Sequence, residues 1–213
     1  MKLGIFGAGE QAKELLNLYE KGDYYGEKYE EIILVDLLDN KEKNVISEDY
    51  FFRKPIKDYN VIVAMGEPHM RKKVQEKLKN KGYTFATFIH KSANIGNNTV
   101  INPGTIIFPF VYIAQSTIIA ENTLVHAGAR IENDCQIGKN CMVSSGAFIG
   151  AKTKIGDTTF VGPNSSVIDG ITIGDDVIIG MSSCVLRNVD DMAVVVGNPA
   201  RFIRQNIDGK IFG

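Results

Sequence analysis

The chain has no marked excess of charge and no long apolar run, and these two absences exclude whole classes of protein. Its 213 residues include 24 Lys and Arg against 25 Asp and Glu, without a basic stripe, so neither nucleic acid nor an anionic membrane is expected as a partner. No segment approaches the roughly 18 consecutive apolar residues of a membrane helix. Met1-Lys2-Leu3 leads directly into an expected strand instead of a signal peptide. These features predict a cytoplasmic protein.

Cysteine is scarce as well. The chain has only Cys135, Cys141 and Cys184, and their spacing lacks the paired ligands that a zinc site needs. Cys135 and Cys141 stand six residues apart, in what is described below as an inward column of the repeat. We therefore expect buried thiols there, with neither a disulfide nor a metal.

A six-residue repeat dominates the rest of the chain. Ile or Val occupies every sixth position from Ile89 to Val185, in 17 of 17 cases. A period of six fits neither an α-helix nor an alternating strand, and it is typical of a parallel β-helix built from hexapeptides. Two residues before each of these positions stands Ala, Cys, Ser or Thr in 14 of 17 cases, which predicts a narrow inward column.

A third column predicts the corners of the coil. Three residues after each repeated Ile or Val stands Asn, Asp, Gly or Ser in 14 of 17 cases, and these residue types tolerate left-handed backbone angles. Pro103-Gly104 and Pro163-Asn164 add a turn signature at this column. Three hexads then close one triangular coil, and five to six coils stack at roughly 4.8 Å. We expect the segment after Val185 to cover the last coil, because an open end would expose unpaired strand edges.

Residues 1–85 lack the repeat and predict a small α/β domain ahead of the β-helix domain at residues 86–213. Strands alternating with helices favour a parallel sheet, here of roughly three strands, and residues 39–55 are expected to form an irregular loop. The expected elements are strands at Leu3–Gly7, Ile32–Asp36 and Val61–Met65, and helices from about Gln11 to Tyr19 and about Pro68 to Lys81.

The first strand is followed by a glycine turn, Gly7-Ala8-Gly9-Glu10-Gln11-Ala12, of the form G-x-G-x-x-A. Such glycines let the backbone approach a diphosphate, and the N-terminus of the next helix presents N–H groups to the anion. Asp36, at the end of the second long strand, could accept hydrogen bonds from a ribose or a base. A dinucleotide cofactor, a nucleotide diphosphate-sugar and a tight turn without a ligand all remain open, and the small size of the domain favours the nucleotide-sugar.

The whole chain resembles the bacterial sugar O- and N-acyltransferases, which include sialic acid O-acetyltransferases and UDP-4-amino-sugar N-acetyltransferases. The resemblance rests on Gly7-Ala8-Gly9 with Ala12-Lys13, Asp36 after Leu34-Val35, Ala64-Met65-Gly66, Phe88-Ile89-His90 and Gly197-Asn198-Pro199-Ala200. It implies a left-handed β-helix, a homotrimer, and transfer of an acetyl group from acetyl-CoA to an amino or hydroxyl group of a nucleotide-activated sugar in bacterial surface glycan synthesis.

The resemblance also implies where the ligands bind. The small domain is expected to bind the nucleotide-sugar, and acetyl-CoA is expected in the cleft between neighbouring β-helices of the trimer. The substrate residues are Gly7, Gly9, Glu10, Gln11, Asp36 and Gly66; the acetyl-CoA residues are Met142, Ser144, Gly146, Ala151, Gly162, Gly180 and Pro199. Backbone N–H groups near Gly146 and Ala151 are expected to polarise the thioester carbonyl.

The chain departs from the family at the general base. Where relatives have a histidine in an Ile-x-His-Asp/Glu-Cys segment, this chain has Asn133, followed by Asp134, and an amide cannot take a proton at neutral pH. Conversely, His126 stands where relatives commonly have Asn, and Gln11 stands where they often have His. We expect His126 to face outward at a corner, meet Asn133 and Asp134 of the neighbouring subunit, and act as the base.

Two alternatives stay open. The loss of the usual histidine fits a catalytically silent member that binds a nucleotide-sugar, and an acyl carrier protein could replace acetyl-CoA as the donor. Phe108 and Phe110, on either side of Pro109 at a corner, are expected to expose at least one ring at a subunit interface. His90 is expected to mark the start of the repeats, and His69 to be a surface residue of a helix.

Overall fold

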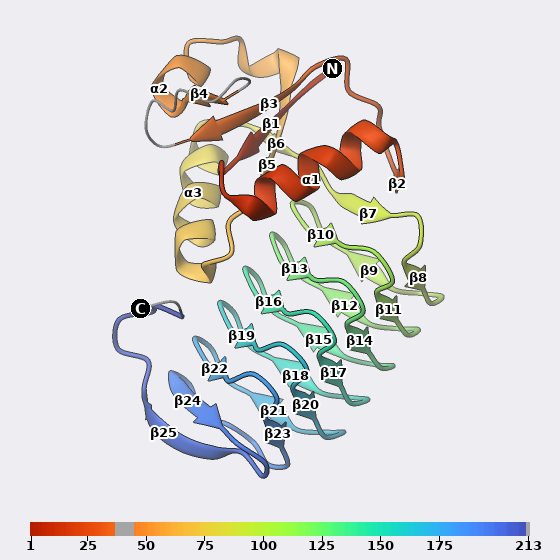
Figure 1. Cartoon of the computed structure of the whole chain (residues 1–213), viewed down its shortest axis with the longest axis vertical. Coiled ribbons are helices and arrows are strands. Elements are labelled where there is room, and N and C mark those ends of the chain that lie inside the picture. The colour runs from red at the N-terminus through yellow and green to blue at the C-terminus, as the bar shows by residue number, and fades with distance from the viewer. Residues whose placement is uncertain (37–44, 212–213) are drawn as a thin grey trace.

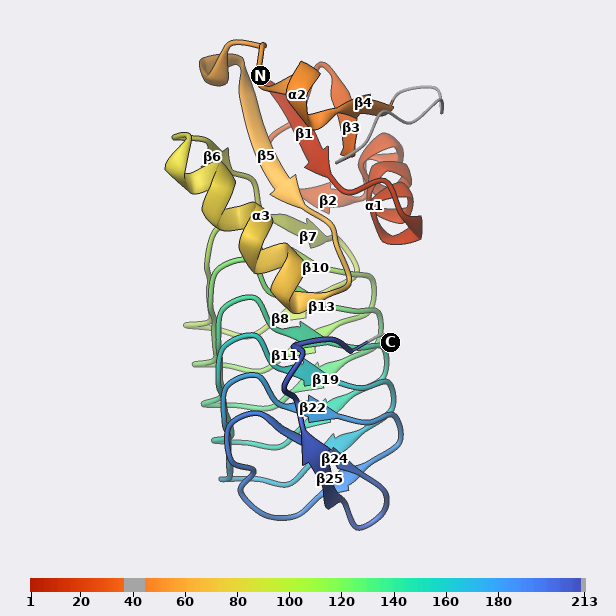
Figure 2. The same ribbon diagram turned by 90° about the vertical axis from the view of Figure 1, so that its left-hand side faces the viewer.

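The computed structural model describes residues 1–36 and 45–211, and it consists of a small α/β domain standing on the first coils of a long β-helix (Figure 1). The strand ladders of the β-helix run along the long axis of the molecule, and the small domain covers one end of it. The C-terminal segment turns back from the far end and runs up one side towards the small domain (Figure 2).

The small domain is a parallel sheet with the strand order β4-β3-β1-β5-β6. Leu3 and Ile5 of the central strand pack with Leu15 on one face, and Phe6 packs with Leu78 on the other, as the period of two predicts. The strands are β1 (Lys2–Phe6), β3 (Ile32–Asp36), β4 (Val45–Ser47), β5 (Tyr59–Val63) and β6 (Thr84–Phe85), and the helices are α1 (Glu10–Lys21), α2 (Glu48–Phe51), the 3-10 helix η1 (Ile56–Asp58) and α3 (Pro68–Asn80).

Two expectations about this domain are wrong in detail. The sheet has five strands instead of three, because the short outer strands β4 and β6 carry too few apolar residues to stand out in the sequence. The expected loop at residues 39–55 contains β4 and α2, and the Ser47 side chain caps α2 by accepting a hydrogen bond from the Tyr50 N–H at 3.4 Å. Residues 39–44 of that loop lie outside the described residues.

The β-helix is a three-sided prism, and its left-handed parallel fold is confirmed by the solved structures compared below. Each strand from β7 to β20 pairs in parallel with the strand 18 residues later, as Ile107 pairs with Val125. The strands in chain order are β7 (Phe88–His90), β8 (Asn94–Ile95), β9 (Val100–Ile101), β10 (Ile106–Ile107), β11 (Tyr112–Ile113), β12 (Ile118–Ile119), β13 (Leu124–Val125), β14 (Arg130–Ile131), β15 (Gln136–Ile137), β16 (Met142–Val143), β17 (Phe148–Ile149), β18 (Lys154–Ile155), β19 (Phe160–Val161), β20 (Ser166–Val167), β21 (Thr172–Ile173), β22 (Ile178–Ile179) and β23 (Cys184–Val185).

The predicted columns of the repeat are confirmed. The repeated Ile and Val residues from Ile107 to Val185 form one buried core. Every position of the corner column from Asn98 to Ser182 has a positive φ, including Phe110, Lys152 and Thr158, whose residue types do not favour it. The geometry of the coil therefore overrides local preference at these three corners.

The narrow inward column is held by polar side chains that bond to the next corner. Thr123 Oγ1 donates to Gly138 O at 2.7 Å, and the thiols of Cys135 and Cys141 donate in the same way to Gly150 O and Gly156 O. Both cysteines are fully buried and free, as expected. Burial raises the pKa of Cys135 to about 11 and that of Cys141 to about 12.

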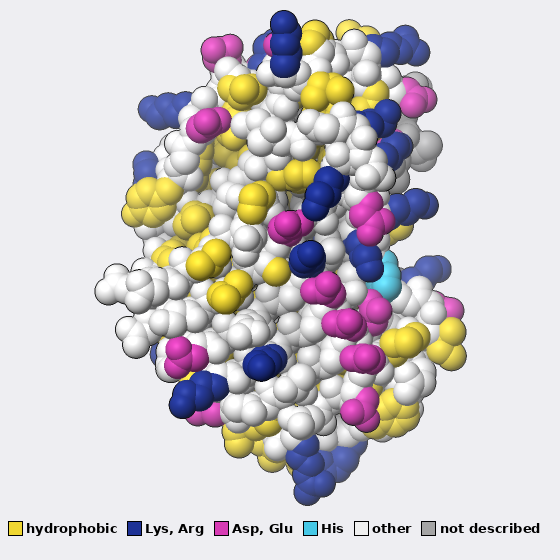
Figure 3. All heavy atoms as spheres, turned by 180° about the vertical axis from the view of Figure 1, so that it is seen from behind, with side chains coloured by type: hydrophobic (Ala, Val, Ile, Leu, Met, Phe, Trp, Pro, Cys, Tyr) yellow, Lys and Arg dark blue, Asp and Glu magenta, His cyan; other side chains and the backbone are white. Residues whose placement is uncertain are grey.

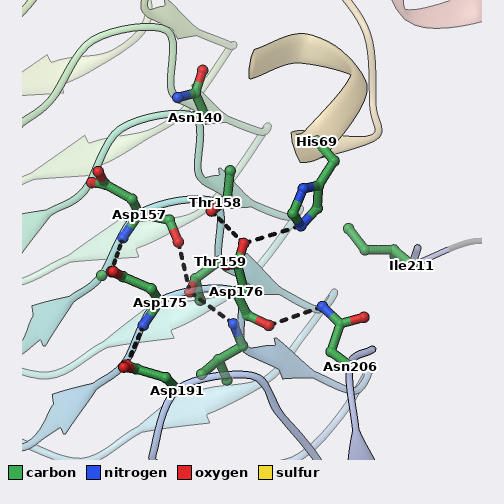
Figure 4. A network of polar contacts seen from close by, with 12 residues as sticks. His69, Asn140, Asp157, Thr158, Thr159, Asp175, Asp176, Asp191, Asn206 and Ile211 are labelled. Carbon is green, nitrogen blue, oxygen red and sulfur yellow. Dashed lines mark hydrogen bonds and ion pairs between the residues drawn. The ribbon is translucent and has the colours of Figure 1, made fainter. Parts of the chain in front are cut away.

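The C-terminal segment covers the last coil, as expected. β24 (Ala193–Val196) extends the sheet of β22, and β25 (Arg201–Gln205) returns antiparallel to it. Beyond β25 the chain contacts both domains (Figure 4). Asn206 Nδ2 donates to Asp176 O at 2.9 Å, and the Ile211 N–H lies 3.2 Å from the Glu67 carboxylate at the start of α3. His69 is therefore more than a surface residue, because its Nε2 lies 3.0 Å from Asp176 Oδ1 in this junction.

Carboxylates line one side of the prism. They gather over the lower half of the face seen from behind (Figure 3). Along one corner, Asp157, Asp175 and Asp191 each accept a backbone N–H from the preceding coil, at 2.6 to 2.8 Å. These acids are explained by the stacking of the coils, because a carboxylate that accepts an N–H replaces one missing bond of the ladder.

The two domains are joined by an apolar column on the outside of one sheet. Its members recur every 18 residues from Phe88 to Ile178, and the last follows after 16: Phe88, Ile106, Leu124, Met142, Phe160, Ile178 and Val194. The first three are fully buried, and they pack with Leu15 and Tyr19 of α1. Phe160, Ile178 and Val194 pack with Ile211. The small domain and the C-terminal segment therefore share one face of the prism between them (Figure 2).

A further strand, β2 (Tyr24–Tyr25), connects the two domains, because it pairs with β7 at the edge of the sheet.

Candidate functional site

The small domain has its topological switch point between β1 and β5. In the order β4-β3-β1-β5-β6 the direction of strand addition reverses there, and open α/β sheets bind ligands at the carboxyl ends of such strands. The turn from Gly7 to Gln11 follows β1, and Met65-Gly66 follows β5. The two segments expected to bind the substrate therefore lie side by side at this end of the sheet, where a Cβ on Gly7 would lie 3.4 Å from Met65 Cγ.

The two glycines of the turn have different roles. Gly7 has φ +119°, and a Cβ there would lie 2.9 Å from Ala64 O, so the turn cannot form with another residue without strain. Gly9 is the N-cap of α1, with φ −75°, and a Cβ there would meet nothing within 4 Å. Its surroundings are open to solvent in front of the helix N-terminus, where an anion is favoured.

Glu10 and Asp36 lie at the same end of the sheet as the glycine turn, Glu10 at the start of α1 and Asp36 at the end of β3. Glu10 is exposed, and its carboxylate lies 3.8 Å from Lys13 Nζ. Asp36 ends β3, half-buried, and pairs in register with Ser47 of β4. Asp36 is therefore placed where the second strand of a nucleotide-binding sheet presents its acid to a ribose.

A side chain of this turn touches the β-helix. Gln11 Nε2 lies 2.8 Å from His126 Nε2, across 115 residues of sequence. The His126 ring stacks on Phe108 of the preceding coil, with 4.8 Å between ring centroids and an interplanar angle of 9°. His126 points out of the coil as expected, and within one chain its ring meets Gln11 of α1. Phe108 is buried under the small domain, while Phe110 is 74% exposed.

Burial sets the protonation state of His126. Desolvation, and then the positive charge of Arg71, lower the pKa of His126 to about 4 from its usual 6.5. At neutral pH the ring is therefore uncharged. Because the Gln11 amide nitrogen can only donate, the lone pair of His126 Nε2 accepts this hydrogen bond, and Nδ1 carries the proton. Such a ring can accept a proton from a group that replaces the Gln11 amide at Nε2, but it does not hold that proton tightly.

Two buried polar atoms near His126 have no hydrogen-bond partner among the described residues. They are Gln11 Oε1 and Ser144 Oγ. Ser144 follows His126 by one coil in the same column, since the His126 N–H bonds to Val143 O at 2.8 Å, and it is 3% exposed. Buried polar groups are normally bonded, so these two atoms are available to a ligand at this place.

Several expected acetyl-CoA contacts have another explanation. The Gly146 N–H already donates to Ala127 O at 3.1 Å and the Ala151 N–H to Asp169 Oδ1 at 3.0 Å, so the expectation that these groups are free to polarise a thioester is wrong. A Cβ at Gly162 or Gly180 would collide with the next turn of chain, at 2.5 and 2.7 Å. These two glycines are required by the coil itself.

The remaining expected residues lie apart from His126. Asn133 and Asp134 bond to each other at 2.8 Å and follow β14, at a different corner of the prism from His126. Met142 packs beneath the junction of the two domains. Pro199 lines a cavity of about 490 Å³ at the end of the β-helix. One chain therefore brings together Gly7, Gln11, Gly66, His126 and Ser144, but not Asn133 or Pro199.

The sequence interpretation missed Arg71. The residue is fully buried at the junction, and it bonds to both domains. A signal was present, because Arg71 falls on the buried stripe of α3 with Pro68, Val74 and Leu78, where an apolar residue is expected.

Neither a metal site nor a membrane helix is found in the described part of the chain. No group of three or more His, Cys, Asp or Glu side chains among the described residues could hold a metal ion. No described helix is long and apolar enough to cross a bilayer.

Two family models cover most of the chain. Residues 2–78 match the PglD N-terminal domain, and residues 116–151 and 152–187 match the bacterial transferase hexapeptide, a model of six repeats. A curated GDP-perosamine N-acetyltransferase of Escherichia coli O157:H7 is 32% identical over 114 residues, which are 51% of this chain and 51% of that protein. The match therefore spans about half the length of this relative.

Solved structures confirm the fold along nearly the whole chain. The acetyltransferase domain of PglB from Neisseria gonorrhoeae, in complex with acetyl coenzyme A, superposes with a TM-score of 0.87 at 22% identity, over 95% of this chain and 98% of that one. A GDP-perosamine N-acetyltransferase from Caulobacter crescentus superposes with a TM-score of 0.86 at 23% identity, over 96% and 98%. In that structure one histidine is changed to alanine, and CoA and GDP-perosamine are bound.

Proposed function

We propose that this chain, which belongs to the hexapeptide-repeat transferases with a PglD N-terminal domain, transfers an acetyl group from acetyl-CoA to an amino or hydroxyl group of a nucleotide-activated sugar. The names of the relatives support this reaction, since they are acetyltransferases, with acetyl-CoA or with CoA and a nucleotide-sugar bound. The product would serve bacterial surface glycan synthesis, and we infer a cytoplasmic enzyme because both proposed substrates are soluble activated metabolites.

One contact carries the proposal. The 2.8 Å bond between Gln11 and His126 joins the diphosphate-binding turn directly to an imidazole of the β-helix. A ligand whose diphosphate lies on the N-terminus of α1 has its sugar directed along this junction. A dinucleotide cofactor or a tight turn without a ligand would give no reason for an imidazole at this point.

The residues of the chain divide the work as follows. The turn from Gly7 to Gln11 binds the diphosphate through helix N–H groups, and Asp36 accepts a hydrogen bond from the ribose or the base. When the sugar amino or hydroxyl group replaces the Gln11 amide at Nε2, neutral His126 accepts the proton of that group as it attacks the thioester carbon. The carbon–sulfur bond then breaks, the acetyl group stays on the sugar, and the proton passes from His126 to the leaving thiolate.

The acetyl-CoA site fits the unpartnered Ser144 Oγ. This hydroxyl is buried one coil beyond His126, so a polar group of the donor could bond to it. Bound acetyl-CoA supplies an acyl group activated as a thioester. Among the expected contacts, Ser144 is the one that the geometry near His126 supports best.

We also propose that the active unit is a homotrimer. Phe110 is 74% exposed at a corner of the prism, and a monomer would leave this ring in water. A neighbouring β-helix at that corner would cover it and would bring Asn133 and Asp134 of another subunit towards His126.

A second candidate function is a silent member that binds the nucleotide-sugar without acetylating it. The observation that favours it is Asn133, whose side chain bonds to Asp134 in the place of the base that the resemblance implies. The two functions share the nucleotide-sugar site and differ only in turnover.

The proposal is tested by mixing the full chain and acetyl-CoA with a panel of UDP-, GDP- and dTDP-linked sugars, and measuring thiol release and acetylated product. One sugar is expected to give turnover. Binding of a nucleotide-sugar without thiol release, for the whole panel, would support the silent member. Tight binding of NADH with no binding of any nucleotide-sugar would contradict both.

A further inference from the structure

Arg71 is the largest side chain that the fold buries completely. It comes from the first turn of α3, and its guanidinium enters the junction between the small domain and the β-helix. Its five hydrogen bonds within the described part of the chain all end on main-chain carbonyl oxygens: Asn122 O at 3.0 Å, Met65 O at 2.7 Å, Gly66 O at 3.4 Å, Asn140 O at 2.5 Å and Cys141 O at 2.8 Å.

This arrangement is costly, which indicates a specific role. A buried guanidinium normally pairs with a carboxylate, whereas here carbonyl oxygens alone accept its hydrogen bonds. Desolvation lowers the pKa of Arg71 to about 10, so the side chain still carries its charge at neutral pH. Simple docking of two domains would be achieved more cheaply by apolar residues of similar volume.

The carbonyls that Arg71 binds belong to the two halves of the candidate site. Met65 and Gly66 form the loop after β5, at the switch point that receives the nucleotide-sugar. Cys141 O accepts both the Arg71 guanidinium and the Leu124 N–H, at 2.8 and 2.9 Å. Leu124 begins β13, and His126 directly follows that strand, so one side chain fixes the substrate loop and the strand that leads to His126.

We propose that Arg71 is a positioning residue: its buried guanidinium holds the Met65–Gly66 loop at a fixed distance from His126 and keeps a positive charge behind that ring. The inference rests on the proposed function, because it assigns Arg71 to the geometry of that site. Arg71 touches neither substrate in this arrangement and acts through the backbone and through His126.

The charges around His126 support the electrostatic part. The coil neighbours on either side, Phe108 and Ser144, are uncharged, and so is Gln11 on α1. Glu10 of α1 has a side chain that is 97% exposed, so water screens it. Arg71 of α3 is the charged group that lowers the pKa of His126, after desolvation. The charge of Arg71 therefore adds to desolvation, the larger cause, in keeping the His126 ring uncharged.

The test compares Arg71→Lys, which keeps a charge but loses the planar fork, with Arg71→Met, which loses both. Arg130→Met is the matched control, since Arg130 is an exposed arginine of the same β-helix, paired with Glu132. Two quantities are measured in each variant: the titration of His126 by NMR, which is simple with three histidines in the chain, and the kinetic constants for nucleotide-sugar and for acetyl-CoA.

Arg71→Met is expected to move the His126 titration upward from about 4, by less than the full shift because desolvation, the larger cause, remains, while Arg71→Lys leaves it low. Arg71→Lys is expected to raise the nucleotide-sugar KM by about 10–100-fold, with the acetyl-CoA KM little changed. Arg130→Met should change none of these. An unchanged titration in Arg71→Met, or equal losses for both substrates in Arg71→Lys, would overturn the proposal, as would failure of both variants to fold, since Arg71 would then serve the fold as a whole.

The two proposals fail in different ways. If the wild type binds no nucleotide-sugar and gives no turnover, the proposed function is wrong, and the kinetic constants of the Arg71 variants cannot be measured. The NMR titration needs neither substrate, so it still decides whether Arg71 controls the charge of His126.

Discussion

A negative charge placed at Gly9, the N-cap of α1, should weaken the binding of the nucleotide-sugar without lowering the stability of the fold. Gly9 has φ −75° and ψ −179°, which any residue adopts, and a Cβ there meets nothing within 4 Å. We compare Gly9→Asp with Gly9→Asn, two side chains of nearly equal size. Both are better N-caps than glycine by a few tenths of a kcal/mol, and the aspartate gains about 0.3–1 kcal/mol more from the helix dipole. Both variants should therefore be at least as stable as the wild type.

The same negative charge should oppose the diphosphate. Two unit charges about 5 Å apart repel by about 0.8 kcal/mol in bulk water and by about 3 kcal/mol at an effective dielectric constant of about 20. Two phosphates double this to about 1.5–6 kcal/mol, which is a loss of about tenfold in affinity at the least. Gly9→Asn adds bulk without charge, so its affinity measures the steric part alone.

Calorimetric titration with the nucleotide-sugar measures both variants against the wild type, at low salt and at about 0.5 M salt. The deficit of Gly9→Asp relative to Gly9→Asn should shrink at high salt, because salt screens exposed charges. Urea unfolding of both variants controls for stability. Equal affinities of two folded variants would refute the placement of the diphosphate at this turn.

Three further predictions concern His126 and the assembly. His126→Gln should lower kcat by about 10²–10⁴-fold, measured by thiol release, while Asn133→His keeps or raises it; an active His126→Gln variant would remove this histidine from the mechanism. The pKa of His126 falls from 6.5 in the unfolded chain to about 4 in the folded chain. As the pH falls, His126 is therefore protonated in the unfolded chain first, which favours unfolding. The contribution of neutral His126 to the free energy of unfolding is complete above pH 6.5 and is lost as the pH falls to 4. The loss is about 3 kcal/mol at most, and urea unfolding at pH 7.5 and 4.5 should show it in the wild type but not in His126→Asn. Phe110→Asp should convert a trimer into smaller species by light scattering, and a monomeric wild type at micromolar concentration would contradict the assembly.

The β-helix could be predicted from sequence because one geometric rule repeats throughout it. A coil of three hexads forces an inward Ile or Val and a left-handed corner at fixed positions, and even Phe110 and Lys152 obey it. The edges of the small domain could not be predicted in this way. β4 is three residues long, so its hydrogen bonds to β3, more than its side chains, decide its conformation.

The parts of the candidate site that could be predicted from sequence are those formed by one continuous segment. The turn from Gly7 to Gln11 is local, and its place at the end of β1 follows from its own sequence. The hydrogen bonds of Gly146 and Ala151 are not local, because their partners Ala127 and Asp169 lie 19 and 18 residues away. A glycine or alanine in a corner therefore does not indicate a free N–H until the stacking of the coils is known.

The sequence also indicates where the small domain packs on the β-helix, through large apolar residues that recur every 18 positions. Outward residues of the repeat should be polar on a face that meets water, yet one residue in each coil of one face, from Phe88 through Ile106 and Leu124, is large and apolar. Such a column requires a cover. Together with an arginine in the apolar stripe of α3, it would have placed the small domain on this face and Arg71 within the junction.

Gln11 and His126 make sense only as a pair. By resemblance, relatives often have histidine where this chain has Gln11 and commonly have asparagine where it has His126, so the chain carries an amide and an imidazole in exchanged places. The bond between them, at 2.8 Å, pairs an amide donor with an imidazole acceptor, and changing either alone would leave a part-buried polar group without this partner. A silent binding protein could fill this place with an apolar pair and avoid that cost. A neutral imidazole near two buried polar atoms without a partner among the described residues is what a site that moves a proton requires.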